Sequence, residues 1–192
     1  MQQTYLTSRM HPTDYPGIYD SITGMIFLGT PHQGSGISDM GTVGKIYDLI
    51  SQQRLQIEDG LLQTIAQDNT ILVDTVADFT RDVKQRTAPP ELFCFYERRS
   101  TPVGLIARLK DHPKEFVVNE SSGSLPGYEK RGLALDHFSI NKFGSNDDYH
   151  YISVVDEMVK MGEKAKDLMR KRGEALCAFP SIGPKRTGRL SF

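Results

Sequence analysis

The residues that could do chemistry in this sequence are His137 and two glutamates that precede it, Glu97 and Glu120. Histidine is the usual proton carrier near pH 7, and a carboxylate can hold its ring in one orientation. Ester hydrolysis by acyl transfer needs such a pair together with a nucleophile and backbone donors for the oxyanion. The ordinary alternatives are a loop histidine bonded to a backbone carbonyl and solvated or arginine-paired glutamates.

Three apolar runs must position these side chains. Residues 24–28 are four bulky apolar residues after a glycine, which predicts a strand buried on both faces. Residues 91–97 and 116–118 predict a second and a third strand. Glu97 ends the second strand, and His137 lies in a loop after the third. We therefore predict an α/β protein with a parallel sheet and helices on both faces.

Helical patterns lie between and after these strands. Prolines at positions 12 and 16 end a first helix, and residues 45–50 and 60–67 predict two short ones. Apolar residues at positions 72, 76, 79 and 83 form one stripe of a longer helix. A last helix is predicted over 151–168, and Gly173 is expected to end it.

The loop after the first strand carries a family resemblance. Its Gly29-Thr30-Pro31-His32 segment, followed by a Gly-Ser pair, resembles the serine-active-site-containing, lipase-like α/β-hydrolases, a group of putative serine esterases that fungi often fuse to NACHT-type modules. The run 136–143 resembles the Asp-His-x-x-x-Cys-Lys-Phe pattern of that family, with Asn141 in place of the cysteine. The resemblance covers about residues 2–151.

The resemblance implies an architecture. Residues 1–172 correspond to an incomplete, C-terminal part of an α/β-hydrolase domain, with a helical lid insertion over about 37–88. Residues 173–192 are expected to form a basic, mobile tail. A missing N-terminal half and a downstream module are the implied partners.

The resemblance also implies site residues. His137 takes the position of the catalytic base, and Glu97 takes that of the orienting acid because this fold places the acid at the end of the penultimate strand. Glu120 is the alternative acid, since 117–122 resembles the family's Val-Val-Pro-x-Glu-Ser-Ala segment. Residues Gly29, Thr30, Pro31 and His32 form a wall of the site, where His32 is expected to fix the loop by hydrogen bonding.

A nucleophile is missing from this pattern. Ser35 and Ser124 have glycine neighbours, but neither lies in a Gly-x-Ser-x-Gly elbow between a strand and a helix. In the resembled family the elbow would lie a few residues before Met1. Loss of a triad serine costs on the order of 10⁶-fold in rate, so we expect no useful hydrolysis by this chain alone.

The composition and residue spacing give no support to several other classes of function. The chain has 192 residues and a net charge of −1, which fits one domain and gives no reason to expect a nucleic-acid partner. Its five histidines and two cysteines show no metal-ligand spacing, and no cofactor is implied. No apolar run approaches the roughly 20 residues that span a bilayer, so we expect a cytoplasmic protein without a transmembrane segment.

Two functions therefore stay open. One is a fragment of a serine esterase whose complete form acts on an acyl ester or a lipid. The other is a non-enzymatic interaction or signalling module derived from a hydrolase domain. Because no partner strand for 24–28 precedes it in the sequence, we expect an unpaired apolar edge and a chain that aggregates or needs a partner.

Overall fold

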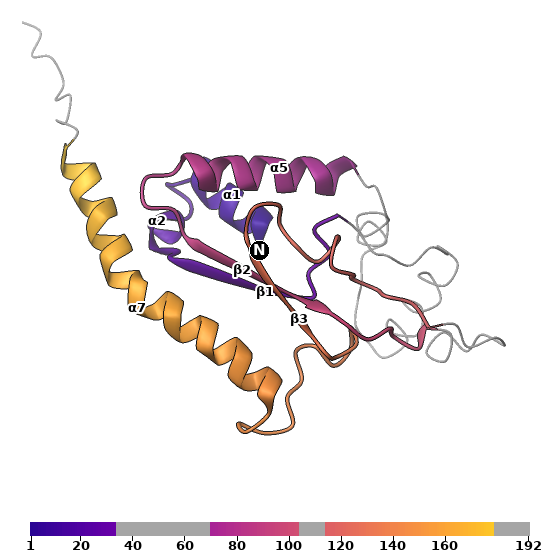
Figure 1. Ribbon diagram of the computed structural model, residues 1–192. Helices are drawn as coiled ribbons and strands as arrows, with labels where there is room; N and C mark the ends of the chain where they lie inside the picture. The colour runs from indigo at the N-terminus through magenta and orange to yellow at the C-terminus, as the bar shows by residue number, and fades with distance from the viewer. Residues whose placement is uncertain (34–69, 104–113, 179–192) are drawn as a thin grey trace, which may run out of the picture.

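A computed structural model of the chain describes residues 1–33, 70–103 and 114–178 (Figure 1). Its three strands form one parallel sheet in the order β1-β2-β3, which confirms the predicted α/β class. The elements are α1 (Gln2–Met10), α2 (Ile18–Ser21), β1 (Gly24–Leu28), α5 (Thr70–Gln85), β2 (Glu91–Glu97), β3 (Glu129–Leu133) and α7 (Tyr149–Ala178).

The central strand β2 is the most deeply buried element of the sheet. It pairs with β1 from Gly24↔Glu91 onward and with β3 from Phe93↔Glu129 onward. Its apolar and aromatic side chains fill both faces, as expected for a strand covered by helices on two sides. All three strands run in the same direction, so their carboxyl ends meet at one edge of the sheet.

Helices α1 and α5 cover one face of the sheet (Figure 1). The stripe predicted for α5 packs inward: Val76, Phe79 and Val83 are buried against Met25 of β1 and its neighbours. Phe79 also meets the ring of Tyr5 from α1 edge to face, at 5.2 Å between centroids. The helix that precedes β2 is therefore part of the core.

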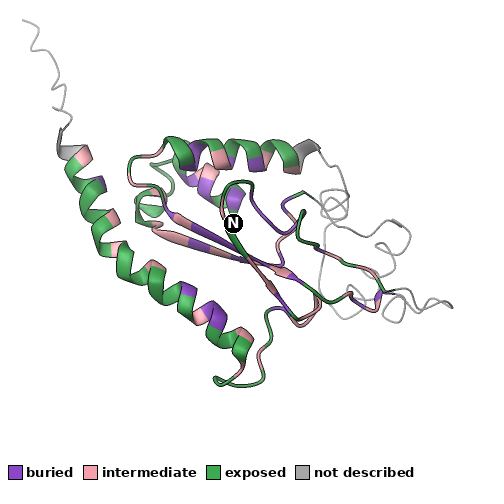
Figure 2. Cartoon of the chain, in the orientation of Figure 1, coloured by how far each residue is buried: buried purple, intermediate pink, exposed green. Residues whose placement is uncertain are grey.

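Helix α7 covers the other face. Val154 and Met161 pack against Phe93 of β2 and against Ile26 and Leu28 of β1. Figure 2 shows that the rest of α7 is largely exposed, with buried residues where it meets the sheet and at Arg172. The two helical layers enclose the sheet, so the prediction of helices on both faces is confirmed for the described residues.

The third strand was predicted at the wrong place. It consists of Glu129–Leu133, whereas residues 116–118 form a loop. Val118 is fully buried and its N–H bonds a side chain of β2, whereas Phe116 is 41% exposed, so only the end of this apolar run is buried. The polar Glu129–Leu133 segment lies at the sheet edge, where charged side chains are normal.

The end of the last helix was also predicted wrongly. Helix α7 continues through Gly173 to Ala178, so the first residues assigned to the tail are helical. A helical glycine costs only about 1 kcal/mol, and a pair between Arg170 and Glu174 spans Gly173 at 2.6 Å. Residues 179–192 lie outside the described residues, as do the short helices expected at 45–50 and 60–67, much of the expected lid, and Ser35.

In the described part of the chain, no helix is both long and apolar enough to cross a membrane.

Candidate acid–base site

Glu97 is the last residue of β2 and points into the protein. Its side chain is fully buried, and its Oε1 accepts a hydrogen bond of 2.6 Å from the N–H of Val118. Among the described residues, its Oε2 has no hydrogen-bond partner. A buried carboxyl oxygen without a donor is unusual, because such groups are normally bonded. One oxygen is thus anchored and the other is free to act on a neighbour.

That neighbour is His137, in the loop that follows β3. Its Nδ1 lies 3.7 Å from Oε2 of Glu97, and this nitrogen too lacks a hydrogen-bond partner within the described residues. The side chain is 27% exposed although Nδ1 itself is covered, so the exposed part of the ring lies away from Nδ1. The geometry turns one nitrogen toward the carboxyl and leaves Nε2 for another partner.

The loop that carries His137 is fixed on both sides of this residue. The N–H of His137 donates to Oγ1 of Thr101 at 3.1 Å. The preceding Asp136 accepts hydrogen bonds from the N–H and the hydroxyl of Ser139, at 3.0 and 2.7 Å. Such side-chain to backbone bonds define a compact turn. Ile140, 2% exposed, then anchors the turn in the core.

Burial sets the protonation of the pair. It raises the pKa of Glu97 from 4.5 to about 7, although hydrogen bonds from Val118 and Val117 act in the opposite direction. It also lowers the pKa of His137 below its ordinary value. Both shifts favour the uncharged forms, so the imidazole is neutral near pH 7. A neutral imidazole is the form that can accept a proton.

Gly29 brings the loop after β1 to the same place. Its φ is +58°, and its N–H donates to the carbonyl of Phe95 at 2.8 Å. A Cβ at this position would lie 3.2 Å from Cγ2 of Ile140 and 3.5 Å from Nδ1 of His137. Glycine is therefore favoured here by the backbone conformation and by the close approach of Ile140, while His137 lies at van der Waals distance.

His32 occupies a different environment from His137. It is only 1% exposed; its Nδ1 lies 3.0 Å from the Gln2 amide nitrogen, and its N–H donates to the Ser122 carbonyl at 2.7 Å. Burial lowers its pKa to about 4. The ring of His32 therefore ties the loop after β1 to α1, and its backbone N–H ties that loop to Ser122. The half-buried Thr30 and Pro31 connect His32 to Gly29.

The alternative acid and the alternative serine have other partners. The carboxylate of Glu120 is 56% exposed and pairs with Lys130 at 3.1 Å. The hydroxyl of Ser124 is directed to the carbonyl of Glu120, and the residue is buried. Of the two candidate acids, the structure thus brings Glu97 to His137, and Ser124 is engaged elsewhere. Ser35 cannot be placed, since it lies outside the described residues.

Two residues that sequence reasoning missed hold the pair in place. Val118 anchors Glu97, and Thr101 anchors His137. Thr101 is fully buried and exchanges two backbone hydrogen bonds with Glu115, at 2.7 and 3.0 Å, as an isolated antiparallel bridge. No spacing in the sequence indicates these contacts. The only signal is the apolar run around Val118, which indicates burial.

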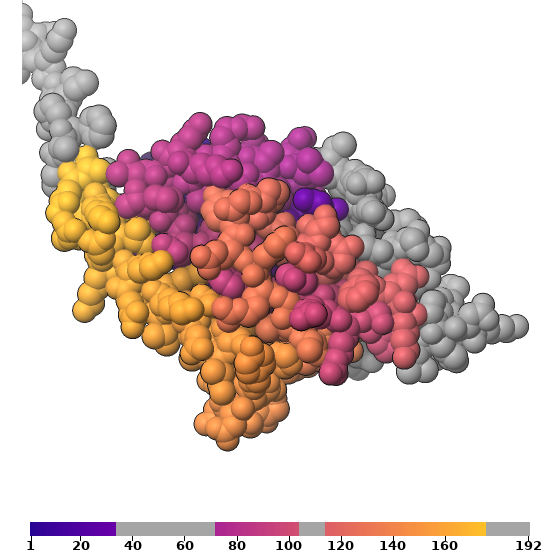
Figure 3. All heavy atoms as spheres, in the orientation of Figure 1, coloured from indigo at the N-terminus to yellow at the C-terminus, as the bar shows by residue number. Residues whose placement is uncertain are grey.

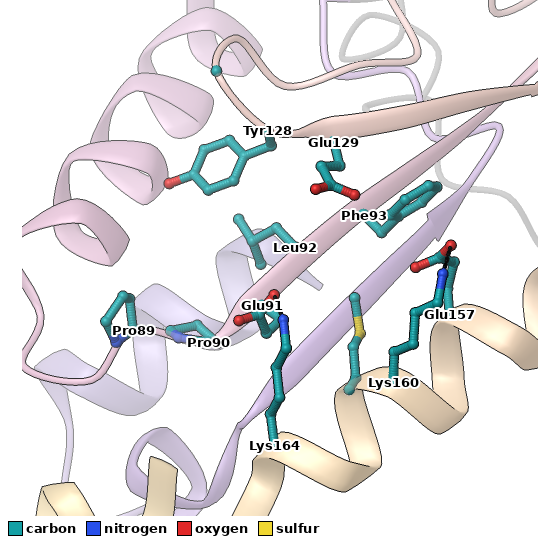
Figure 4. Close-up of a pocket in the computed structure, with 12 residues that line it drawn as sticks. Pro89, Pro90, Glu91, Leu92, Phe93, Tyr128, Glu129, Glu157, Lys160 and Lys164 are labelled. Carbon is teal, nitrogen blue, oxygen red and sulfur yellow. Dashed lines mark hydrogen bonds and ion pairs between the residues drawn. The ribbon is translucent and has the colours of Figure 1, made fainter. Parts of the chain in front are cut away.

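A cavity of about 460 Å³ lies at the other end of the sheet, where β2 and β3 begin (Figure 4). Phe93 and Tyr128 contribute aromatic walls, and Lys164 of α7 reaches Glu91 at 3.1 Å across its rim. Glu97 and His137 are at the carboxyl ends of the strands, so the cavity belongs to a different part of the molecule. Among the described residues, no group of three His, Cys, Asp or Glu is arranged to hold a metal ion.

Comparison with known proteins finds no match to the chain among protein families, curated proteins or solved structures. The resemblance to lipase-like hydrolases therefore depends on the motifs around Gly29 and His137, and the α/β architecture stands on the parallel sheet itself.

Proposed function

We propose that Glu97 and His137 are the acid and the base of an acyl-ester hydrolase site of the α/β-hydrolase kind. The observation that carries the proposal is the approach of Glu97 Oε2 to His137 Nδ1, 3.7 Å apart, with no other hydrogen-bond partner for either atom in the described residues. A catalytic hydrogen bond is often longer in a free enzyme and shortens when the substrate or nucleophile is in place.

The roles follow from this geometry. Nε2 of His137 takes the proton of an attacking hydroxyl, while Oε2 of Glu97 holds the proton on Nδ1 and orients the ring. The pair follows the chain order of α/β-hydrolases, in which the acid precedes the histidine. The position of Glu97 at the carboxyl end of a parallel strand also supports the proposal, because ligands of open parallel sheets bind at that edge.

The nucleophile is proposed to come from polypeptide outside this sequence, so that the 192-residue chain alone does not hydrolyse esters. A fluorophosphonate probe, which reacts with activated serines, tests both statements. The purified chain should remain unlabelled. Labelling at Ser35, with Ser35→Ala as the control, would show instead that the chain contains its own nucleophile.

The acid and base are tested in the polypeptide that includes the in-frame codons upstream of Met1. We expect that this longer protein is labelled, that His137→Ala lowers the labelling rate by at least about 10³-fold, and that Glu97→Gln lowers it substantially. The matched control is Glu120→Gln, which should keep the wild-type rate. Absence of labelling in the longer protein, or a loss with Glu120→Gln instead of Glu97→Gln, contradicts the proposal.

A second candidate function is an interaction module without catalysis. The observation in its favour is a group of exposed apolar side chains on α7, including Ile152, Met158 and Val159 at 42%, 58% and 54% exposure. Exposed apolar surface of this kind is typical of protein interfaces. The probe experiment separates the two candidates, since a module gives no labelling in the longer protein.

A further inference from the structure

The cavity where β2 and β3 begin lies between the sheet and α7 (Figure 4). Its volume of about 460 Å³ falls in the range of sites that hold small organic ligands, about 300–1,000 Å³. In the space-filling view α7 runs along one side of the molecule (Figure 3). The helix contributes four residues at positions i, i+3, i+4 and i+7, which share one helical face: Glu157, Lys160, Met161 and Lys164. This face of α7 forms one wall of the cavity.

The opposite wall comes from β2 and β3. Arg131 of β3 donates a hydrogen bond to Glu157 of α7, so its side chain lies on the α7 face of the sheet. Glu129 is two residues earlier in the same strand and therefore points to the same face. It stands in register with Phe93 of β2, whose ring also packs on that face. Figure 4 shows the carboxyl group of Glu129 beside the ring of Phe93, so a carboxylate and an aromatic ring lie next to each other in this wall.

The charges of the two walls are unevenly paired. The side chain of Glu157 is 7% exposed, and its Oε1 accepts hydrogen bonds of 2.9 Å from both Arg131 and Lys160. Two cations thus share one carboxylate, which leaves an excess of positive charge on this side. The carboxylate of Glu129 has no hydrogen-bond or ion-pair partner within the described residues. The cavity therefore has a positive side at Lys160 and a negative side at Glu129.

The rest of the lining is neutral or apolar. Glu91 and Lys164 pair at 3.1 Å across the rim and balance each other. Phe93, which is 4% exposed, and Met161 present ring and thioether atoms between the charged sides. The acidic and basic side chains around the cavity are therefore equal in number, and an apolar surface separates the unpaired carboxylate from the excess cation.

We propose that this cavity binds a free α-amino acid with an apolar side chain. The ammonium group of the ligand donates to Glu129, and its side chain packs on Phe93. Its carboxylate accepts from Lys160, which keeps N–H donors beyond the one bonded to Glu157. A zwitterion supplies a partner for both charged sides, whereas a simple cation or anion leaves one of them unmatched. The cavity and Glu97 lie at opposite ends of the strands, so this binding does not depend on ester hydrolysis.

Ligand-observed NMR titration of the full chain with L-phenylalanine tests the proposal. Saturable binding is expected, with a dissociation constant of about 0.1–1 mM. N-acetyl-L-phenylalanine lacks the ammonium group, L-phenylalaninamide lacks the carboxylate, and glycine lacks the apolar side chain. Each of these three should bind at least about tenfold more weakly. Equal affinity for the amide or for the N-acetyl form would show a site for a single charge and would overturn the proposal.

A pair of variants locates the binding. Glu129→Gln should weaken L-phenylalanine binding at least about tenfold and abolish the preference for L-phenylalanine over its N-acetyl form, because the partner of the ammonium group is lost. Glu129 is exposed, so the variant should stay folded. Glu163→Gln is the matched control, since Glu163 is an exposed glutamate of α7 outside the cavity lining, and its affinity should equal that of wild type. No saturable binding up to about 10 mM, or equal affinities in the two variants, would also overturn the proposal.

Discussion

His32 and His137 differ in how far their rings are exposed and in the groups beside them. His32 is enclosed and bonded to Gln2, and its pKa falls to about 4, so it remains neutral and structural at ordinary pH. His137 keeps part of its ring exposed and faces the carboxyl of Glu97. The two histidines lie close to the same loop, but of the two only His137 combines partial exposure of its ring with a neighbouring carboxyl group.

The raised pKa of Glu97 predicts a pH-dependent cost of its burial. Between its ordinary pKa of 4.5 and its folded pKa of about 7, the folded protein binds more protons than the unfolded chain. Its contribution to stability is therefore present below pH 4.5 and lost as the pH rises through 7. Glu97→Gln removes this loss. As the pH rises from 4.5 to 7, the free energy of unfolding of the variant should therefore increase relative to wild type by up to about 3 kcal/mol.

Urea unfolding of both proteins at a series of pH values measures this difference. The lowered pKa of His32 makes stability rise with pH in the wild type and in the variant alike. Its effect therefore cancels when the free energy of unfolding of one protein is subtracted from that of the other. A constant difference between pH 4.5 and 8 would show that Glu97 titrates like an exposed glutamate.

The candidate residues could be named from the sequence, but their arrangement could not. His137 and Glu97 stand out because they follow strands in the order of an acid and a base. The choice between Glu97 and Glu120 depends on which carboxylate meets the ring, and that contact joins residues 40 positions apart. The support from Val118 and Thr101 comes through loops, whose paths are not encoded in any local periodicity.

At the scale of elements, the sequence indicates burial more reliably than pairing. The runs that form β1 and the interior of β2 are apolar, as buried parallel strands require, and both strands were predicted. The Glu129–Leu133 strand could not be recognised by its apolar content, because it is polar and lies at the edge of the described sheet. Residues 116–118 are apolar but form a loop, in which Phe116 is exposed and Val118 is buried against Glu97.

The turn that ends β1 gives a prediction at this scale. Gly29 and Gly17 both have positive φ, at 58° and 75°, but of the two only Gly29 is crowded, by Ile140. Gly17→Ala should cost about 1 kcal/mol through its backbone conformation, and Gly29→Ala should cost at least about 1 kcal/mol more. Denaturant midpoints of the two variants provide the measurement. Equal losses would show that the turn accommodates a side chain beside Ile140.

At the scale of the whole molecule, one side chain joins distant parts of the chain. Arg172 of α7 is 5% exposed, and its guanidinium donates to the carbonyls of Asp20, Ile22 and Ala88 at 2.7, 2.8 and 2.9 Å. These carbonyls lie in the segments that lead into β1 and β2. The end of the last helix thus holds the starts of two strands.

Arg172→Ala should therefore destabilise the entire fold. Three carbonyls lose their donor in a covered site, which predicts a loss of about 2–4 kcal/mol in the free energy of unfolding. Lys171→Ala is the control, because Lys171 is 53% exposed and pairs with Asp167 on the surface. Lys171→Ala should change the free energy of unfolding by no more than about 0.5 kcal/mol. A similar small loss for Arg172→Ala would mean that α7 is held by its apolar contacts alone.

The parallel order of the strands also determines when the sheet can form. Gly24 pairs with Glu91, so β1 leaves the ribosome long before its partner β2 exists, and parallel pairing closes a long loop. During synthesis, this uncharged strand has both edges open while the central strand is still being made. We therefore expect the risk of aggregation to be highest before β2 has been synthesised, because the apolar β1 segments of neighbouring nascent chains can then associate with each other.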